Sequence, residues 1–263
     1  MELNLTGKVA LVTGSTSGIG LGIAERLAEE GCTTIMNAHL PAEEVTGVLS
    51  ELAEKYDGEI EYRQADMSNP DAIGKLLEGI ISHHQQLDIL VNNAGVQVVS
   101  PIQDFKNEDW ENVQDINLNS AFHTTKAAFP GMLKRGWGRI IHIASAHGLV
   151  ASAFKAAYVT AKHGMIGLGK VTALEGAEHG ITCNMICPGY VLTPLVDQQI
   201  DDQAKVHKIS RDRVIAEIML TPQPTKKFVQ IEEIAALAAF LCSDHAASIT
   251  GAAIPIDGGW TAR

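Results

Sequence analysis

The chain has 263 residues, of which 46% are hydrophobic and 19% charged, and its 20 Lys and Arg against 31 Asp and Glu give a formal net charge of −11. This apolar content excludes disorder for most of the chain, and the acidic balance argues against nucleic acid or a membrane surface as the main partner. No apolar run reaches the roughly 18–20 residues of a transmembrane helix, and residues 1–14 lack the features of a signal peptide.

Short β-type runs alternate with longer helical patterns along the chain. The expected strands are residues 8–13, 33–37, 60–65, 87–91, 138–145, 181–187 and 252–256, and the expected helices are residues 18–30, 41–56, 69–84, 107–134, 156–179 and 231–243. A fully apolar strand such as Lys8–Thr13 is typical of a sheet buried on both faces. The alternation predicts one α/β domain over residues 1–263, a Rossmann-type doubly wound parallel sheet with helices on both faces.

One polar segment, about residues 193–229, interrupts the alternation after the sixth strand without a regular pattern. Ligands of an open α/β sheet bind outside the carboxyl ends of its strands. We therefore expect this segment to act as a substrate lid, and the alternative is a surface excursion without function.

A glycine-rich loop follows the first strand and precedes a helix, with Gly14, Gly18 and Gly20 in the spacing GxxxGxG. Glycines at such a place allow a tight turn and a close approach of the backbone to a pyrophosphate. Asn92–Gly95 after the fourth strand and Asp66 after the third support a dinucleotide site.

The second strand ends at Ala38 and His39, with no Asp or Glu to bind the ribose hydroxyls and no Arg or Lys to bind a 2′-phosphate. A phosphate buried without a cation is costly, whereas free hydroxyls can bond to water or backbone. The sequence therefore favours NAD over NADP.

Tyr158 and Lys162 lie four residues apart on an expected helix and share a face, while Ser145 ends the fifth strand. Together with the glycine loop, Asn92–Gly95, Asn117 and Pro188-Gly189, they resemble the short-chain dehydrogenase/reductase family over essentially the whole chain. The resemblance implies a seven-stranded parallel sheet, a homotetramer, and a catalytic tetrad of Asn117, Ser145, Tyr158 and Lys162.

The resemblance also implies the roles of the site residues. Tyr158 is the general base, and because a phenol with a pKa near 10 is a poor base, the ammonium of Lys162 is expected to lower that pKa. Ser145 is expected to stabilise the substrate oxygen. The implied cofactor contacts are Gly14, Thr16, Ser17, Gly18, Ile19, Gly20, Ala38, His39, Asp66, Met67, Asn93, Ala94, Gly95, Tyr158, Lys162, Pro188, Gly189, Val191 and Thr193.

Four hydrogen-bond donors are expected near the reacting end: Gln97, His147, Lys155 and Gln199, with Lys155 as a permanent cation. Donors that converge on one point suggest a small carboxylate substrate. The strings at residues 145–152, 186–189 and 257–263 resemble family members that oxidise (R)-3-hydroxybutyrate reversibly to acetoacetate with NAD. The resemblance implies the substrate contacts Gln97, Ser145, His147, Lys155, Tyr158, Tyr190 and Gln199.

Several alternatives remain open at this point. Tyr190 stands where those members often carry Trp, so a slightly larger 3-hydroxy acid is one alternative. A reductase of 3-oxoacyl thioesters is another, although it would require a cation for NADPH. A dinucleotide-sensing protein or a scaffold without turnover would be alternatives outside the enzymes.

The four cysteines predict neither a disulfide nor a metal site. Cys183 and Cys187 lie on one expected strand, about 13 Å apart, which is too far for a disulfide. With Cys32 and Cys242 they are expected to be buried thiols of a cytoplasmic protein. No CxxC pair is present, so no metal is expected, and His83 and His84 are expected to face solvent at the end of a polar helix.

Overall fold

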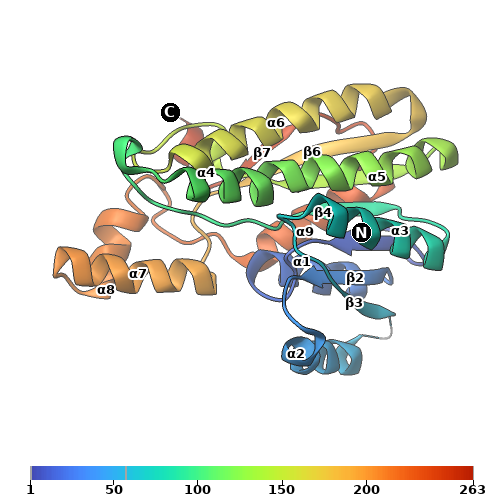
Figure 1. Cartoon of the computed structure of the whole chain (residues 1–263), viewed down its shortest axis with the longest axis horizontal. Helices are drawn as coiled ribbons and strands as arrows, with labels where there is room; N and C mark the ends of the chain where they lie inside the picture. The colour runs from blue at the N-terminus through green and yellow to red at the C-terminus, as the bar shows by residue number, and fades with distance from the viewer. Residues whose placement is uncertain (1, 57, 263) are drawn as a thin grey trace.

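Seven parallel strands form a single sheet in the order β3-β2-β1-β4-β5-β6-β7, as the doubly wound α/β prediction requires (Figure 1). The computed structural model describes residues 2–56 and 58–262, apart from the side chains at positions 195, 198, 199, 202, 203, 206 and 207. The strands are β1 (Val9–Val12), β2 (Thr33–Ala38), β3 (Ile60–Gln64), β4 (Ile89–Asn92), β5 (Gly138–Ile143), β6 (Ile181–Pro188) and β7 (Ala253–Ile256).

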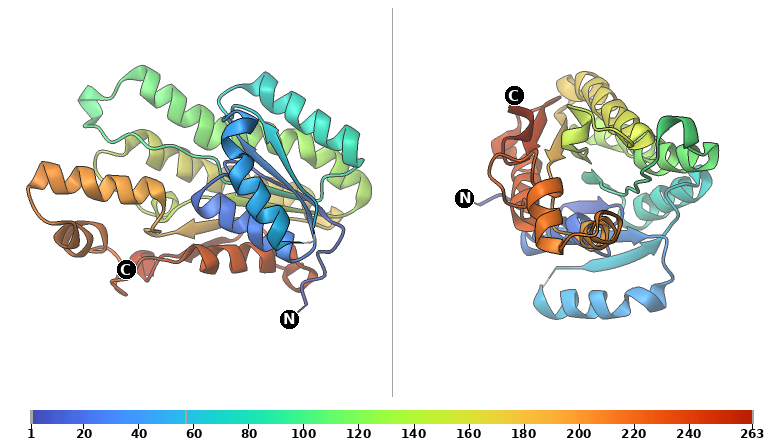
Figure 2. Two further views of the ribbon diagram at one scale, coloured as in Figure 1. Left: turned by 90° about the horizontal axis from the view of Figure 1, so that it is seen from below. Right: turned by 90° about the vertical axis from the view of Figure 1, so that its left-hand side faces the viewer.

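Helices cover both faces of the sheet (Figure 2). One face carries α1 (Gly18–Glu29), α2 (Ala42–Lys55) and α9 (Ile231–Cys242). The other face carries α3 (Pro70–His84), α4 (Asn107–Gln114), α5 (Ser120–Arg135) and α6 (Ala156–Gly176). Two further helices, α7 (Pro194–His207) and α8 (Arg211–Val214), project beyond one end of the sheet (Figure 1).

The first strand shows why the apolar runs are continuous. Ala10 and Val12 pack in the apolar cluster beneath α1 and α9, while Val9 and Leu11 pack in the cluster beneath α3 and α5. Successive side chains of a strand point to opposite faces, so a sheet covered on both faces needs apolar residues at every position.

The long helix expected at residues 107–134 is interrupted by a π-helical turn at Asp115–Asn119. Asn117, inside this turn, is fully buried. Its Oδ1 accepts a hydrogen bond from the backbone N–H of Val96 at 2.8 Å, and its Nδ2 donates to the Val96 carbonyl at 2.9 Å. Single π-helical turns are frequent at functional sites, and this one holds the loop that follows β4.

The expectation of an irregular segment at residues 193–229 is wrong, because much of it is helical. Thr193 caps α7 by accepting a hydrogen bond from the N–H of Val196, and Pro194 occupies the first helical position, where a proline is favoured. The segment has a small apolar cluster of its own around Ile200 and Val214. Its two ends meet where Val191 pairs with Val229.

All four cysteines are buried with free thiols, as the sequence predicts. Burial raises the pKa of Cys187 to about 11, which leaves this thiol protonated at neutral pH and unreactive. None of the described helices is both long and apolar enough to span a membrane.

Candidate active site

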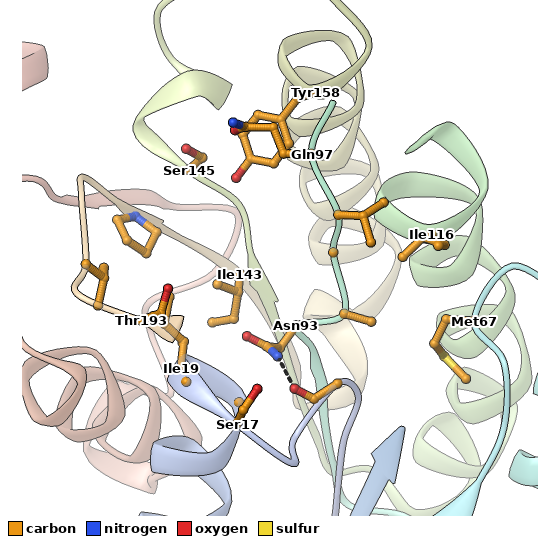
Figure 3. Close-up of a pocket in the computed structure, with 18 of the residues that line it drawn as sticks. Ser17, Ile19, Met67, Asn93, Gln97, Ile116, Ile143, Ser145, Tyr158 and Thr193 are labelled. Carbon is orange, nitrogen blue, oxygen red and sulfur yellow. Dashed lines mark hydrogen bonds between the residues drawn. The ribbon is translucent and has the colours of Figure 1, made fainter. Parts of the chain in front are cut away.

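A cavity of about 600 Å³ runs along the carboxyl ends of the strands, where an open α/β sheet binds its ligands. Figure 3 shows Ser145, Tyr158 and Gln97 gathered at one end of this cavity, and Ser17 and Ile19 at the other. We describe these as the reacting end and the glycine-loop end.

The glycine loop adopts a conformation that few other residues could adopt. Gly14 and Gly18 have positive φ angles of 61° and 58°, which favour glycine. A Cβ atom at Gly20 would overlap the Gly14 carbonyl and the Asn93 amide. The loop therefore brings bare backbone to the cavity.

Asn93 holds this loop in place from the neighbouring strand. Its Nδ2 donates to the carbonyls of Thr13 and Gly14, each at 2.9 Å, and Figure 3 shows a hydrogen bond of Asn93 as a dashed line. The Thr13 hydroxyl in turn accepts from the backbone N–H groups of Asn93 and Ala94. The segment Asn92–Gly95 thus fixes the position of the glycine loop through hydrogen bonds.

The N-terminus of α1 is suited to a dinucleotide pyrophosphate. Ser17 at the N-cap position makes no side-chain capping bond, and the first turn holds no acidic residue. Such an end presents unpaired N–H groups and the positive end of the helix dipole to an anion. The structure places every one of the nineteen residues proposed for the cofactor along this cavity.

The two lysines among the described cavity-lining residues, Lys155 and Lys162, both belong to the reacting end. At the end of β2 the cavity is lined by Ala38 and His39 instead. Arg63, on the adjacent strand β3, bonds to Glu61 through both its Nε and a terminal nitrogen. No arginine of the described part of the chain lines the cavity.

Three of the four tetrad residues meet at the reacting end. Ser145 follows β5, and its Oγ accepts from the N–H of His147 at 3.1 Å. Lys162 is buried, donates to the Ile143 carbonyl at 2.7 Å, and lies 5.7 Å from the centre of the Tyr158 ring. Asn117 is bonded to the Val96 backbone instead of facing these groups.

The electrostatics of this group differ from the sequence expectation. Burial raises the pKa of the Tyr158 phenol above its usual value, and hydrogen bonding to Ser145 only partly opposes this. Burial also lowers the pKa of Lys162 to about 8. The Lys162 ammonium donates to the Ile143 carbonyl, and burial, Ser145 and Tyr190 are the influences that shift the pKa of Tyr158.

At the reacting end, Gln97, His147 and Lys155, which the sequence predicts as carboxylate contacts, line the cavity. Lys155 donates to the Tyr190 hydroxyl at 3.5 Å, and His147 Nε2 lies 2.8 Å from the Ser152 hydroxyl. Burial lowers the pKa of Lys155 to about 8 and that of His147 to about 4. Lys155 is therefore a titratable cation and not a permanent one, and His147 is neutral at pH 7.

Two residues outside the predicted set shape the same end. Trp260 stacks on Tyr190 with 5.5 Å between ring centres, and its ring meets His147 edge-on at 5.0 Å. Gln223 is fully buried and accepts from the Tyr190 N–H. Trp260 could have been noticed in the sequence as a lone aromatic directly after the glycine pair Gly258-Gly259, whereas nothing in the sequence marked Gln223. Gln199 lies on α7, and its side chain is outside the described ones.

Comparisons with known proteins agree with this geometry. Residues 8–204 match the family model described as short chain dehydrogenase. The chain is 52% identical to the D-beta-hydroxybutyrate dehydrogenase of Rhizobium meliloti, over 97% of this chain and 99% of the relative. It is 50% identical to the enzyme of the same name from Cupriavidus necator, over 98% and 100% of the two chains. An actinorhodin polyketide ketoreductase solved with NADPH superposes with a TM-score of 0.91, at 35% identity over 98% of each chain. The chain belongs to the short-chain dehydrogenase/reductase family.

Proposed function

We propose that this oxidoreductase interconverts (R)-3-hydroxybutyrate and acetoacetate. The observation that carries the proposal is the reacting end itself, where the half-buried Lys155 and two further donors, Gln97 and His147, lie in one cavity with Ser145 and Tyr158. The two relatives at 50% identity or more, both D-beta-hydroxybutyrate dehydrogenases, support the same substrate.

In this proposal the carboxylate of the substrate bonds to Lys155, His147 and Gln97, while the apolar end packs against Tyr190 and Trp260. At pH 7 Lys155 is mainly protonated and His147 is neutral, so the pocket offers a cation and neutral donors to an anion. A charge-assisted hydrogen bond is stronger than a neutral one, which makes Lys155 the main anchor.

Tyr158 exchanges a proton with the substrate oxygen, and Ser145 donates a hydrogen bond to that oxygen. Because burial raises the pKa of Tyr158, the phenol is protonated at neutral pH and set to act as a proton donor in the reduction of acetoacetate. Oxidation requires the phenolate and should become faster as the pH rises. A bound nicotinamide cofactor supplies the hydride acceptor or donor.

NAD is proposed as the cofactor, with its pyrophosphate at the N-terminus of α1 and its adenosine near Ala38, His39 and Asp66. We expect kcat/KM to be at least about tenfold higher with NAD than with NADP, which corresponds to about 1.4 kcal/mol, because no lysine or arginine lines the described cavity at the end of β2. Steady-state kinetics with the two cofactors measure this ratio. Equal values would contradict the preference.

Residues 193–229 are proposed to close over the substrate. Pro194 and Val196 line the cavity, and the segment is joined to the rest of the domain where Val191 pairs with Val229. We expect its amides to exchange faster in the free protein than in the complex with NAD and substrate, because its apolar cluster is small and such units open at low free energy. Hydrogen exchange that is the same with and without ligand would rule out a lid.

We also propose a homotetramer in the cytoplasm. Exposed apolar side chains stand on three neighbouring helices, with Trp110 on α4, Phe122 on α5, and Val171 and Leu174 on α6 (Figure 1). Such surfaces mark protein–protein contacts. The four buried free thiols are compatible with a reducing compartment.

One assay tests the proposed function. The purified protein is supplied with NAD and with NADP, and turnover is measured on a panel of 3-hydroxy acids, steroids and 3-hydroxyacyl thioesters. We expect the highest kcat/KM with NAD and (R)-3-hydroxybutyrate. A preference for thioesters with NADP would assign the reductase alternative instead, and tight NAD binding without any turnover would favour a sensor.

A further inference from the structure

We propose that Glu61, His83 and His84 form a binding site for a divalent transition-metal ion, at the edge of the sheet away from the active site. Glu61 lies on the edge strand β3, and the two histidines are the last residues of α3. The carboxylate oxygen and the two imidazole nitrogens lie within 4.8 Å of one another.

His84 does not face solvent as expected from the sequence, because its side chain is only 10% exposed. Its Nε2 and the Oε1 of Glu61 are buried and lie 2.9 Å apart, yet neither has a hydrogen-bond partner among the described residues. The two atoms are therefore close without the alignment that a hydrogen bond requires. Buried polar atoms without partners are costly, and an ion bound to both would satisfy them.

The distances suit a small metal ion. Oε1 lies 2.9 Å from Nε2 of His84 and 3.8 Å from Nε2 of His83. These values lie on either side of the roughly 3.3 Å that separates two ligands of a tetrahedral ion with bonds of about 2.0–2.1 Å. Two imidazoles and one carboxylate favour Zn²⁺ or Ni²⁺ over Mg²⁺, which prefers oxygen. His83 is 60% exposed, so water can complete the coordination.

Arg63 positions the carboxylate for this role. Its Nε and a terminal nitrogen donate to Oε2 of Glu61 at 3.0 and 2.6 Å, which leaves Oε1 directed to the histidines. The guanidinium also neutralises the charge of Glu61. Because Arg63 already compensates the negative charge of Glu61, no protein charge remains to compensate that of a bound ion. We therefore expect weaker binding than at a closed zinc site of four cysteines.

The site joins the end of α3 to β3 and is remote from the chemistry. Glu61 precedes Asp66, which lines the cavity, by five residues, or about 16 Å of extended chain. A bound ion should therefore stabilise the fold without entering the reaction. The proposal is independent of the substrate and cofactor assigned above.

The test is calorimetric titration of the untagged, metal-free protein with ZnCl₂, and with MgCl₂ for comparison. We expect one Zn²⁺ per chain, no heat from Mg²⁺, and a rise of the melting temperature with Zn²⁺. His84→Ala and His83→Ala should each lower the zinc affinity by more than the ~10- to 100-fold that loss of an outer-shell partner costs. The matched control His179→Ala removes an exposed histidine after α6 and should leave zinc binding unchanged.

His83→Ala is the variant that should retain the native fold, because this exposed side chain contributes little to the core. Circular dichroism and NAD binding report whether each variant is folded. Absence of stoichiometric zinc binding by the wild type, or unchanged binding in folded His83→Ala and His84→Ala, would overturn the proposal.

Discussion

Replacing Tyr158 by phenylalanine is expected to lower kcat by about 10²–10⁴, the usual range for a lost general acid or base. The substitution removes one oxygen from a half-buried ring and leaves the ring itself in place, so the packing at the reacting end should be retained. The loss should occur in both directions of the reaction, since the same hydroxyl gives and receives the proton. Steady-state kinetics of oxidation and reduction measure the effect.

Two controls accompany this variant. The dissociation constant of NAD, followed by fluorescence titration, should remain within a few-fold of the wild type, because the hydroxyl is not the main cofactor contact. Tyr56→Phe removes the same atom at the end of α2, outside the cavity, and should be fully active. Near-normal turnover by Tyr158→Phe would show that another group carries the proton.

Replacing Lys155 by alanine is expected to lower kcat/KM for 3-hydroxybutyrate by about 10- to 150-fold, from the roughly 1.5–3 kcal/mol that a charge-assisted hydrogen bond contributes. Substitutions of His147 and Gln97 should act in the same direction and non-additively, because all three groups hold one carboxylate. Part of the loss should appear in kcat, since the anchor also orients the reacting carbon. Lys170→Ala removes an exposed lysine of α6, the helix that Lys155 directly precedes, and is the matched control.

The titration of Lys155 gives this prediction a second readout. Burial lowers its pKa to about 8, so the cation is present below pH 8 and is lost as the pH rises through that value. In the free enzyme, kcat/KM for acetoacetate reduction should therefore fall above about pH 8, before Tyr158 titrates. The fall should be smaller in the pH profile of Lys155→Ala, where Lys162, whose pKa burial also lowers to about 8, is the remaining lysine among the described residues of the cavity. An identical fall in both proteins would assign it to another group.

The fold and the lining of the glycine-loop end of the cavity could be predicted because their residue types have few alternatives. Glycine is favoured at the positive φ angles of Gly14 and Gly18, and a chain of alternating apolar strands and amphipathic helices has few compact topologies. The insertion was harder to interpret. Its polar composition concealed α7, although Thr193 and Pro194 form a recognisable helix start.

The hydrogen bonds and pKa shifts of the Tyr158 and Lys162 side chains could not be predicted from the sequence, because they depend on burial in the folded protein. The spacing of Tyr158 and Lys162 already predicts that they share one helix face. Only the fold shows that the Lys162 ammonium donates to the Ile143 carbonyl and that burial is the main cause of the raised pKa of Tyr158. The same holds for Trp260, which reaches Tyr190 from the far end of the chain. Contacts of that kind depend on tertiary structure alone.

The central claim is that this dehydrogenase recognises the carboxylate of its substrate. The most direct test is the ratio of kcat/KM for (R)-3-hydroxybutyrate to that for its methyl ester, measured with NAD at pH 7. The ester keeps the reacting alcohol and lacks the charge. We predict that the wild type uses the acid at least about tenfold better, in line with the loss of one charge-assisted bond, and that the ester loses little further activity in Lys155→Ala. Equal use of acid and ester by the wild type would contradict the assignment of 3-hydroxybutyrate, although membership of the dehydrogenase family would stand.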